Sequence, residues 1–397
     1  MSQDNRSMQM ILAGDLCMRD LSEKIDESYA QKILQDILPY LKQADIRLIN
    51  LENPLTAADK PIAKSGPNLK GKPENIAFLT AGGFDCAVLA NNHLGDYGPA
   101  GVIETLSLLD DNGIGHVGGG RNLDESYEPW YVERNGLTAA VVAVAENEFG
   151  GAGTDRPGMA GLNCGRLLQA IDAARQNAEF VIVVIHGGNE YNPLPSPRVV
   201  DRYRLIARCG ADAVIGMHTH CPQGYEQYRG VPIIYSTGNF LFHNEEEPSE
   251  NSSWYYGYLP KLICTPGRQV NLEIIPYRFD PACTRITPFI GQQSEKMHEY
   301  LRKISGLFQD SRQRTDYFKG WCMIGGIGYI DKLVYREKYM REPEWASSKD
   351  FLILRNLLTC EAHNEIITQF MVMIENNEIG FGVNMAEEVR KLQVMPI

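Results

Sequence analysis

Six polar residues with metal-binding side chains recur along the chain, each at or just after the end of a short apolar run. They are two carboxylates, one carboxamide and three imidazoles: Asp15, Glu52, Asn92, His186, His218 and His220. This mixed set of oxygen and nitrogen donors suits zinc, manganese or iron better than calcium or magnesium alone. Because a carboxylate can bridge two ions, the set predicts two divalent transition-metal ions (Mn, Zn or Fe) that activate a shared water.

Each of these elements also has a purely structural interpretation. The Gly14-Asp15 pair is typical of a turn, and Asn91-Asn92 is typical of a loop or a helix cap. The pair His218 and His220 is a stronger signal, because alternate residues of an extended segment project to the same side. The sequence contains neither a G-x-S-x-G nucleophile elbow nor a P-loop, so the whole set favours metal-activated water.

The apolar runs before these residues predict the strands of a layered α/β fold. Some runs, such as VIVVIHG, are apolar throughout, which is typical of strands covered on both faces. In an open α/β sheet, ligands bind outside the carboxyl ends of the strands, so distant segments meet at one edge. The predicted strands are Met8–Ala13, Ile46–Leu51, Asp85–Ala90, Thr138–Ala145, Phe180–Ile185, Ala213–Gly216 and Pro232–Tyr235, and helices are expected over Tyr29–Lys42 and Pro99–Asn112.

The last part of the chain changes in character. The acidic stretch EEEPSENSS after Asn244 predicts an exposed loop, and strands are expected at Trp254–Cys264 and Gln269–Pro276. From about Gln292 the composition is helical. We therefore expect one domain over residues 8–285 and a C-terminal helical module over residues 286–397, to which the sequence assigns no chemistry.

Composition limits the partners and the compartment. The 397 residues are 44% hydrophobic and 22% charged, which is globular, and the net charge of −12 argues against bulk attraction to nucleic acid or to anionic membranes. No apolar run is long enough to span a membrane, and the first residues lack the pattern of a secretory signal. The nine cysteines include no CxxC pair, and their odd number suits reduced thiols. We expect a cytoplasmic protein, of an oligomeric state that the sequence does not indicate.

The order and spacing of the motifs resemble the bacterial capsule synthesis family, the CapA type associated with poly-γ-glutamate capsule, within the calcineurin-like metallophosphoesterase superfamily. The resemblance covers roughly residues 8 to 280 and rests on GDL at 14–16, NLEN at 50–53, ANNHLGDYG at 90–98, HGGNEY at 186–191, GMHTH at 216–220 and YSTGNFLF at 235–242. It implies a four-layer α/β/β/α sandwich. It also implies that Asp15 and His220 bind the first metal, that Glu52 bridges, and that the second metal is bound by Asn92, His186 and His218.

The resemblance further assigns catalytic residues. His93, next to the ligand Asn92, would assist the leaving group or steady the transition-state oxygens. This chain departs from the wider superfamily in having Cys17 where a histidine is usual and Glu52 where most phosphoesterases have aspartate. A Cys17 thiolate could bind a soft ion, and a buried inert thiol is the alternative.

Residues near the predicted ligands indicate contacts with substrate. The candidates for substrate binding are Asn91, Glu190, Tyr191 and Asn239. Lys64, Lys70 and Arg198 could place positive charge near an anion, and solvent exposure is their structural alternative.

The remaining histidines have no partner at ligand spacing. His116 lies in a predicted edge strand before a triple glycine that we interpret as a turn, and His298 and His363 lie on polar faces of the tail helices. His243 follows the Gly238-Asn239-Phe240 segment and could face the same crevice as the donors.

The predicted function is a metal-dependent hydrolase of a phosphomonoester or phosphodiester, in capsule or exopolymer metabolism. Its substrate would be a small anionic molecule or an anionic polymer. Two alternatives use the same residues: hydrolysis of a γ-glutamyl amide by the same metals, and a non-enzymatic capsule-assembly partner that grips an anionic polymer.

Overall fold

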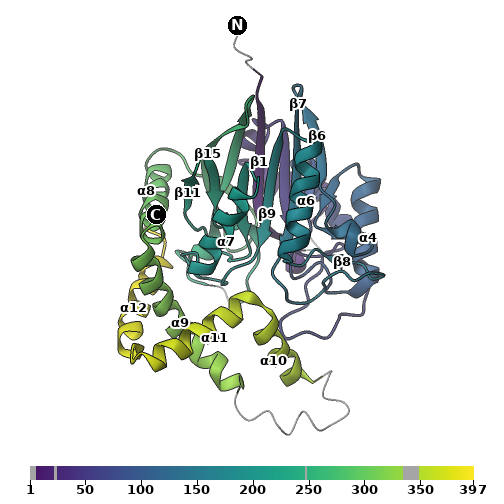
Figure 1. Ribbon diagram of the computed structural model, residues 1–397. Coiled ribbons are helices and arrows are strands. Elements are labelled where there is room, and N and C mark those ends of the chain that lie inside the picture. Colours follow the sequence, from purple (N-terminus) through teal and green to yellow (C-terminus); the bar gives the residue numbers. More distant parts are fainter. Residues whose placement is uncertain (1–5, 22–24, 246–247, 334–347) are drawn as a thin grey trace.

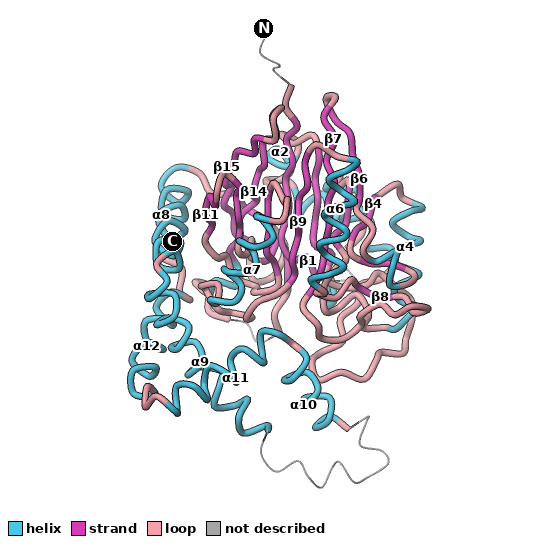
Figure 2. The backbone as a smooth tube through the Cα atoms, in the orientation of Figure 1, coloured by secondary structure: helices cyan, strands magenta, loops and turns pink. Residues whose placement is uncertain are grey.

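The computed structural model describes the chain apart from residues 1–5, 22–24, 246–247 and 334–347 (Figure 1). Two β-sheets pack against each other, helices cover their outer faces, and a group of C-terminal helices lies beneath one end of this sandwich. Figure 2 shows the strands in the middle of the body, with many connecting loops at the end nearest those helices. That end is where the carboxyl ends of the parallel strands meet.

The first sheet has eight strands in the order β16-β15-β14-β1-β2-β3-β4, and β13 also pairs with β1. The strands β1 to β4 are parallel, whereas β14, β15 and β16 are antiparallel additions. The bounds are β1 (Met8–Cys17), β2 (Ile46–Leu51), β3 (Cys86–Val88), β4 (Gly115–Val117), β13 (Asn239–Phe242), β14 (Tyr256–Thr265), β15 (Gln269–Phe279) and β16 (Ile286–Pro288).

The second sheet has six strands in the order β11-β12-β10-β9-β7-β6. Its central strands are parallel and fully covered, and every residue of β9 is buried, as its run of β-branched residues predicts. The bounds are β6 (Trp130–Arg134), β7 (Leu137–Ala145), β9 (Phe180–His186), β10 (Ala213–Met217), β11 (Tyr225–Tyr228) and β12 (Val231–Ile234). A separate pair joins β5 (Gly119–Gly120) to β8 (Gly158–Met159).

Helices cover both outer faces, which completes the predicted four-layer α/β/β/α sandwich. On the first sheet, Phe78 of α3 packs edge-on against Phe240 of β13, and α4 contacts β4. On the second sheet, α6 lies over β7 and β9, and α7 lies over β10 and β12. The helical elements of this part are α1 (Glu27–Leu34), α2 (Leu38–Leu41), α3 (Ile76–Gly82), α4 (Gly98–Asp111), α5 (Leu123–Ser126), α6 (Cys164–Asn177), α7 (Pro197–Arg208), and the short 3₁₀ helices η1 (Arg19–Leu21), η2 (Pro73–Asn75) and η3 (Ser253–Tyr255).

Three local predictions were wrong. The single helix expected over Tyr29–Lys42 is two helices, because Pro39 lacks the N–H that would continue α1 and starts α2 instead. The strand expected from Trp254 starts at Tyr256, since residues 253–255 form η3. The triple glycine is a turn only at Gly118, where φ is +81°, and its last two residues pair with β8.

Three further expectations from the sequence can be compared with the structure. None of the nine cysteines, all of which lie in the described residues, is part of a disulfide bond, as the odd number and the spacing predict. No helix in the described part of the chain combines the length and the apolarity needed to cross a membrane. The exposed loop expected at EEEPSENSS is present at Glu245 and over 248–251, and residues 246–247 lie outside the described residues. The cytoplasmic location stays a prediction.

The C-terminal residues form the predicted helical module. Its first helix packs on the main hydrophobic core through Met297, Leu301 and Phe308, whereas later helices share a second core that includes Trp321, Cys322 and Met373. The domain boundary at residue 285 stays a prediction. The helices are α8 (Gly291–Gln309), α9 (Ser311–Leu333), α10 (Lys349–Thr359), α11 (Glu361–Glu375) and α12 (Ile379–Leu392).

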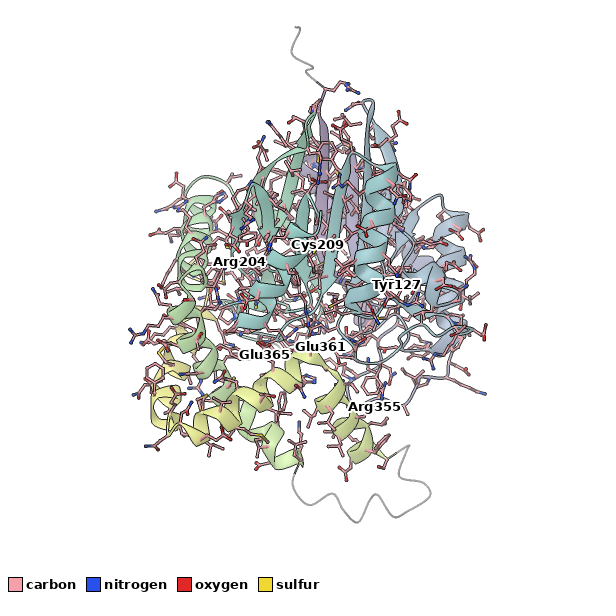
Figure 3. All side chains as sticks on the ribbon, viewed as in Figure 1. Tyr127, Arg204, Cys209, Arg355, Glu361 and Glu365 are labelled. Atoms are coloured by element: carbon pink, nitrogen blue, oxygen red, sulfur yellow. The ribbon has the colours of Figure 1, made fainter. Side chains whose placement is uncertain are left out.

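Buried ion pairs fasten α11 to the sandwich. Arg198 of α7 donates from Nη1 to Glu146 Oε1 at 2.6 Å and from Nε to Glu365 Oε2 at 2.8 Å. Only 20% of the Arg198 side chain is exposed. Figure 3 labels Glu361 and Glu365 on α11, on the side of that helix nearest the strand ends. One guanidinium therefore links two carboxylates from separate parts of the fold.

Replacement of Arg198 by Met is expected to destabilise the protein by about 3 kcal/mol, because it removes the ion-pair partner of Glu365 and leaves Glu146 with only the more distant Arg202, 3.7 Å away. Urea denaturation measures the change. The control is Arg312→Met, whose side chain is 92% exposed and whose removal should change stability by less than about 0.5 kcal/mol. Equal midpoints for the two variants would show that this ion-pair network does not hold α11 in place.

Candidate metal centre

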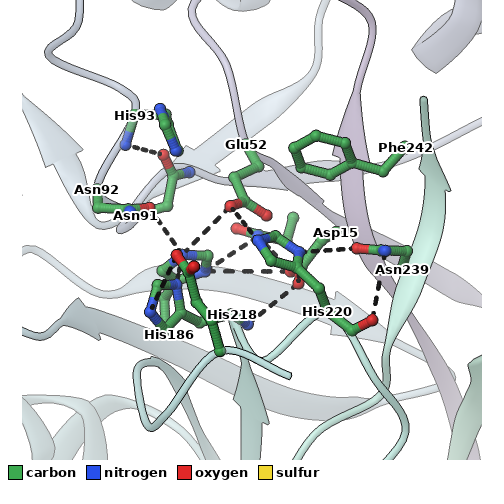
Figure 4. Close-up of polar contacts among 12 residues, drawn as sticks. Asp15, Glu52, Asn91, Asn92, His93, His186, His218, His220, Asn239 and Phe242 are labelled. Carbon is green, nitrogen blue, oxygen red and sulfur yellow. Dashed lines mark hydrogen bonds and ion pairs between the residues drawn. The ribbon is translucent and has the colours of Figure 1, made fainter. Parts of the chain in front are cut away.

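The six predicted donors converge at the carboxyl ends of the parallel strands (Figure 4). The aspartate sits near the end of β1, beside a shift in strand register, where Gly14 allows the backbone of β13 to approach closely. A Cβ on Gly14 would lie only 1.9 Å from the carbonyl oxygen of Gly238, so glycine is required there. The other donors follow β2, β3 and β10 or end β9: Glu52, Asn92, His218, His220 and His186.

The donor atoms form two groups that share Glu52. One group is Asp15, Glu52 and His220, and the other is Glu52, His186 and His218. A third group, without Glu52, joins Glu190 to His218 and His220, and within each group the donor atoms lie within 4.8 Å of one another. The Nε2 atoms of His186 and His220 lie 3.7 and 3.6 Å from the same oxygen, Glu52 Oε1. Asn92 Oδ1 lies 3.1 Å from His186 Nε2, which places it with the second group. This grouping matches the expected one, although the ligand roles stay a prediction.

The state of Glu52 shows that the residues fit a cation. Its side chain is fully buried, and among the described residues neither carboxylate oxygen has a hydrogen-bond partner. A buried carboxylate without hydrogen bonds is costly unless a positive charge compensates it. Burial and the neighbouring Asp15 raise the pKa of Glu52 well above its ordinary value, and burial raises the pKa of Asp15 to about 6.

Two of the histidines, His186 and His220, are in the neutral form that binds metal ions. Burial lowers the pKa of His186 well below its ordinary value and that of His220 to about 3, so both rings are uncharged at neutral pH. Nδ1 of His220 lies 2.9 Å from Asn239 Oδ1, whose amide nitrogen donates to the carbonyl of Trp254. An amide oxygen accepts only, so Nδ1 carries the proton and the Nε2 lone pair faces Glu52.

Metal affinity is expected to fall at least ~10-fold between pH 7.5 and pH 5.5. The pKa values of Asp15 and Glu52 are raised, so both carboxylates take up protons as the pH falls, and those protons compete with the cation. Calorimetric titration of the metal-free protein with Mn²⁺ at the two pH values, in buffers of different ionisation enthalpy, measures the affinity and the protons released. An affinity that does not change with pH would contradict the assignment of these carboxylates.

His93 lies beside the donors in a buried hydrogen-bonded cluster. Its Nδ1 is 2.7 Å from Asp96 Oδ2, and Lys64 Nζ is 2.6 Å from Asp96 Oδ1 and 3.2 Å from the carbonyl of Asn92. Burial and the nearby Lys64 lower the pKa of His93. With Nδ1 engaged, Nε2 is the nitrogen that remains for substrate.

The three basic candidates have different surroundings. Lys64 is buried, with 3% of its side chain exposed, and contacts the His93 cluster. Lys70 donates to the carbonyl of Ala58 and lies over the ring of Tyr97. Arg198 belongs to the ion pairs beneath α11. The positive charge in contact with the centre is therefore that of Lys64.

The four substrate candidates divide into two pairs. Asn91 and Asn239 are fully buried and their amides bond to protein groups, and their contact with substrate stays a prediction. Glu190 and Tyr191 are 44% and 45% exposed, with Glu190 Oε1 4.0 Å from His218 Nε2 and the Tyr191 ring stacked on Trp254. These two stay candidates for contact with substrate.

Several residues that contact the predicted donors were not predicted from the sequence. Asn50 donates from Nδ2 to Asp15 Oδ1 at 2.7 Å, and Glu148 Oε1 lies 3.9 Å from His218 Nε2. Trp254 and Phe242 enclose the His220 ring, each with a centroid separation of 5.0 Å. Glu148 follows β7 as the other donors follow their strands, and that position is the signal that could have identified it.

Cys17 and the four histidines outside the predicted site have different surroundings. Cys17 is buried and belongs to none of the donor groups found among the described residues. His116 lies in the edge strand β4, as predicted, and His298 is half-buried on α8. His363 is half-buried rather than on an open polar face, with its ring edge-on to Tyr329. His243 lies just beyond β13 and is partly exposed.

A four-layer sandwich with these donors at its strand ends defines the class of calcineurin-like metallophosphoesterases. The family model described as bacterial capsule synthesis protein PGA_cap matches residues 9–244. The chain therefore belongs to this family, as its motifs predict, and the helices α8 to α12 lie outside the matched residues.

The chain is similar to named relatives over part of its length. It is 31% identical over 250 residues to the capsule biosynthesis protein CapA of Bacillus anthracis. The aligned residues cover 60% of this chain and 61% of that protein. It is 30% identical over 258 residues to the PGA biosynthesis protein CapA of Bacillus subtilis, covering 62% of this chain and 67% of that one. Among solved structures, a novel phosphatase from Mycoplasma pneumoniae shares 13% identity with a TM-score of 0.45, over 70% of this chain and 96% of that one.

Proposed function

We propose that this chain is a metal-dependent hydrolase of a phosphomonoester or phosphodiester in capsule or exopolymer metabolism. The observation that carries the proposal is the buried Glu52, whose two oxygens accept no hydrogen bond from any described residue and belong both to a donor group with Asp15 and His220 and to one with His186 and His218. Two divalent ions held there would bind phosphoryl oxygens and supply a water of lowered pKa as the nucleophile.

The side chains around the donors have separate tasks in this proposal. Asp96 holds the His93 ring through Nδ1, so that Nε2 points to the leaving oxygen or to the oxygens of the transition state. The ammonium of Lys64 pairs with Asp96 and adds positive charge beside an anionic substrate. The aromatic rings around His220 limit the access of water to that side of the centre.

The names of the relatives favour a second candidate. Both are described as capsule or PGA biosynthesis proteins. A γ-glutamyl amide of poly-γ-glutamate is the bond that such a protein would meet, and the same metal centre can polarise its carbonyl. A capsule-assembly partner that binds the polymer without cleaving it is the non-enzymatic form of this candidate.

Elemental analysis of the purified protein, followed by assays after reconstitution with Mn²⁺, Zn²⁺ or Fe²⁺, tests the proposal. We expect about two ions per chain and metal-dependent release of phosphate or alcohol from phosphate esters. Metal-dependent cleavage of oligo-γ-glutamate in place of phosphate esters would establish the second candidate. Bound metal without any turnover would favour the assembly partner, and a protein that takes up no metal would overturn all the readings that use the centre.

A further inference from the structure

A polar pocket of about 380 Å³ opens beside the metal centre, and the C-terminal helix α10 forms one of its walls. The other walls are the loop that follows β7, which carries Glu148, and the loop that carries His93, which contributes Gly95. These two loops meet backbone to backbone, since a Cβ on Gly95 would lie 2.4 Å from the Cα of Gly150. The pocket is therefore built from three segments far apart in the sequence.

Glu148 connects the pocket to the centre. Its Oε1 lies 3.9 Å from His218 Nε2, and its Oε2 accepts a hydrogen bond of 3.3 Å from Asn356 of α10. Gly95, which also lines the pocket, follows His93 by two residues. A substrate with its reacting group at the donors would thus have its next chemical group at or inside this pocket.

Two arginines make the pocket lining positive. Arg355 of α10 lies with its guanidinium 4.8 Å from the ring centroid of Phe149, and Arg156 donates from Nη2 to the carbonyl of Gly151. Across the described ranges neither guanidinium has a carboxylate partner, and both residues are exposed. Glu148 is the one carboxylate among the described residues that line the pocket. Two uncompensated guanidinium groups therefore face a space large enough for an anionic group.

We propose that this pocket is a subsite for a second anionic group of the substrate, recognised by Arg355 and Arg156. The inference rests on the proposed function, because it places the bond to be hydrolysed at the metal centre. A guanidinium binds a carboxylate or a phosphate through two parallel hydrogen bonds, which gives direction as well as charge. The preferred substrate is then a molecule with repeated anionic groups, whose next unit lies in the pocket. Arg355 lies outside the matched residues 9–244, so this side of the subsite is supplied by the C-terminal helices.

Binding of two probes to the full-length, metal-loaded protein tests the subsite. Fluorescence anisotropy would measure the affinity for labelled oligo-γ-glutamate, and competition with tripolyphosphate would measure the affinity for a phosphate polyanion. The double variant Arg156→Gln/Arg355→Gln is expected to bind oligo-γ-glutamate at least ~10-fold more weakly than wild type, with unchanged metal content. The matched control is Arg312→Gln, an exposed arginine of α9, which should keep the wild-type affinity.

The outcomes are distinct. Weakening for tripolyphosphate alone would keep the subsite and assign it to phosphate groups rather than carboxylates. Equal affinities for wild type, double variant and control, or no binding of either probe by wild type, would overturn the subsite. Arginine-dependent binding in a protein that hydrolyses no phosphate ester would reject the proposed function while leaving the subsite in place.

Discussion

Replacement of Glu52 by Gln is expected to empty the metal centre and to lower turnover by roughly 10³-fold or more. Glu52 is the carboxylate that both donor groups share, so its loss affects two ions at once. An amide has the same shape but carries no charge, and only one of its two polar atoms can bind a metal. Elemental analysis should fall from about two ions per chain to fewer than one.

The same variant should unfold at the same denaturant concentration as the metal-free wild type, or at a higher one. Burial and the nearby Asp15 already raise the pKa of Glu52 well above its ordinary value, which means that the ionised carboxylate is unfavourable in the metal-free fold. A neutral amide removes that charge. A large drop in the stability of the metal-free protein would instead show that Glu52 has a structural partner, and the assignment as a metal ligand would fail.

Glu226→Gln is the matched control for a buried carboxylate. Glu226 accepts two hydrogen bonds of 2.8 Å from Arg204 and one of 2.7 Å from the hydroxyl of Tyr235. Its replacement leaves Arg204 without a counter-charge and should cost ~2 kcal/mol of stability while the metal content stays at the wild-type level. The two variants should thus show opposite patterns: one loses metal and keeps stability, and the other keeps metal and loses stability.

The sequence predicted that the six candidate donors converge, because their positions follow from local patterns. Apolar runs such as the one before His186 identify buried parallel strands, and parallel strands bring the residues after them to one edge. The contacts of Lys64 and Glu148 depend instead on how loops fold over that edge, which no periodicity records. Lys64 in particular was as compatible with solvent exposure as with its buried contact with Asp96.

How the C-terminal helices dock on the rest of the fold was harder to predict from the sequence. Their helical periodicity was readable, but the residues that dock them are single polar side chains spread along the chain. Asn147, for example, donates two hydrogen bonds to α11: its backbone N–H and its Nδ2 both donate to the carboxylate of Glu361, at 2.9 and 2.8 Å. Only the folded arrangement shows that α10 and α11 approach the loop that carries Glu148, and with it the metal centre.

Replacement of His93 by Ala is expected to slow the chemical step by roughly 10²- to 10⁴-fold while metal content stays close to wild type. The side chain is held through Nδ1 by Asp96 and presents Nε2, so it acts on the substrate rather than on the ions. The size of the decrease in rate should depend on the leaving group of the ester. Alkyl phosphates need a proton on the departing oxygen, whereas 4-nitrophenyl phosphates release a stable anion and should be affected less.

This dependence separates a catalytic role from a merely structural one. A His93 that only packed the loop would, when replaced, lower the turnover of both kinds of ester by the same factor, because the fault would lie in the geometry of the centre. Loss of metal in the variant would make His93 a ligand. The expected combination is retained metal, a larger defect for alkyl esters, and a changed pH profile, since the group that titrates at Nε2 would be absent. That combination requires the ring to exchange a proton with the substrate, which is the task that its bond to Asp96 fits it for.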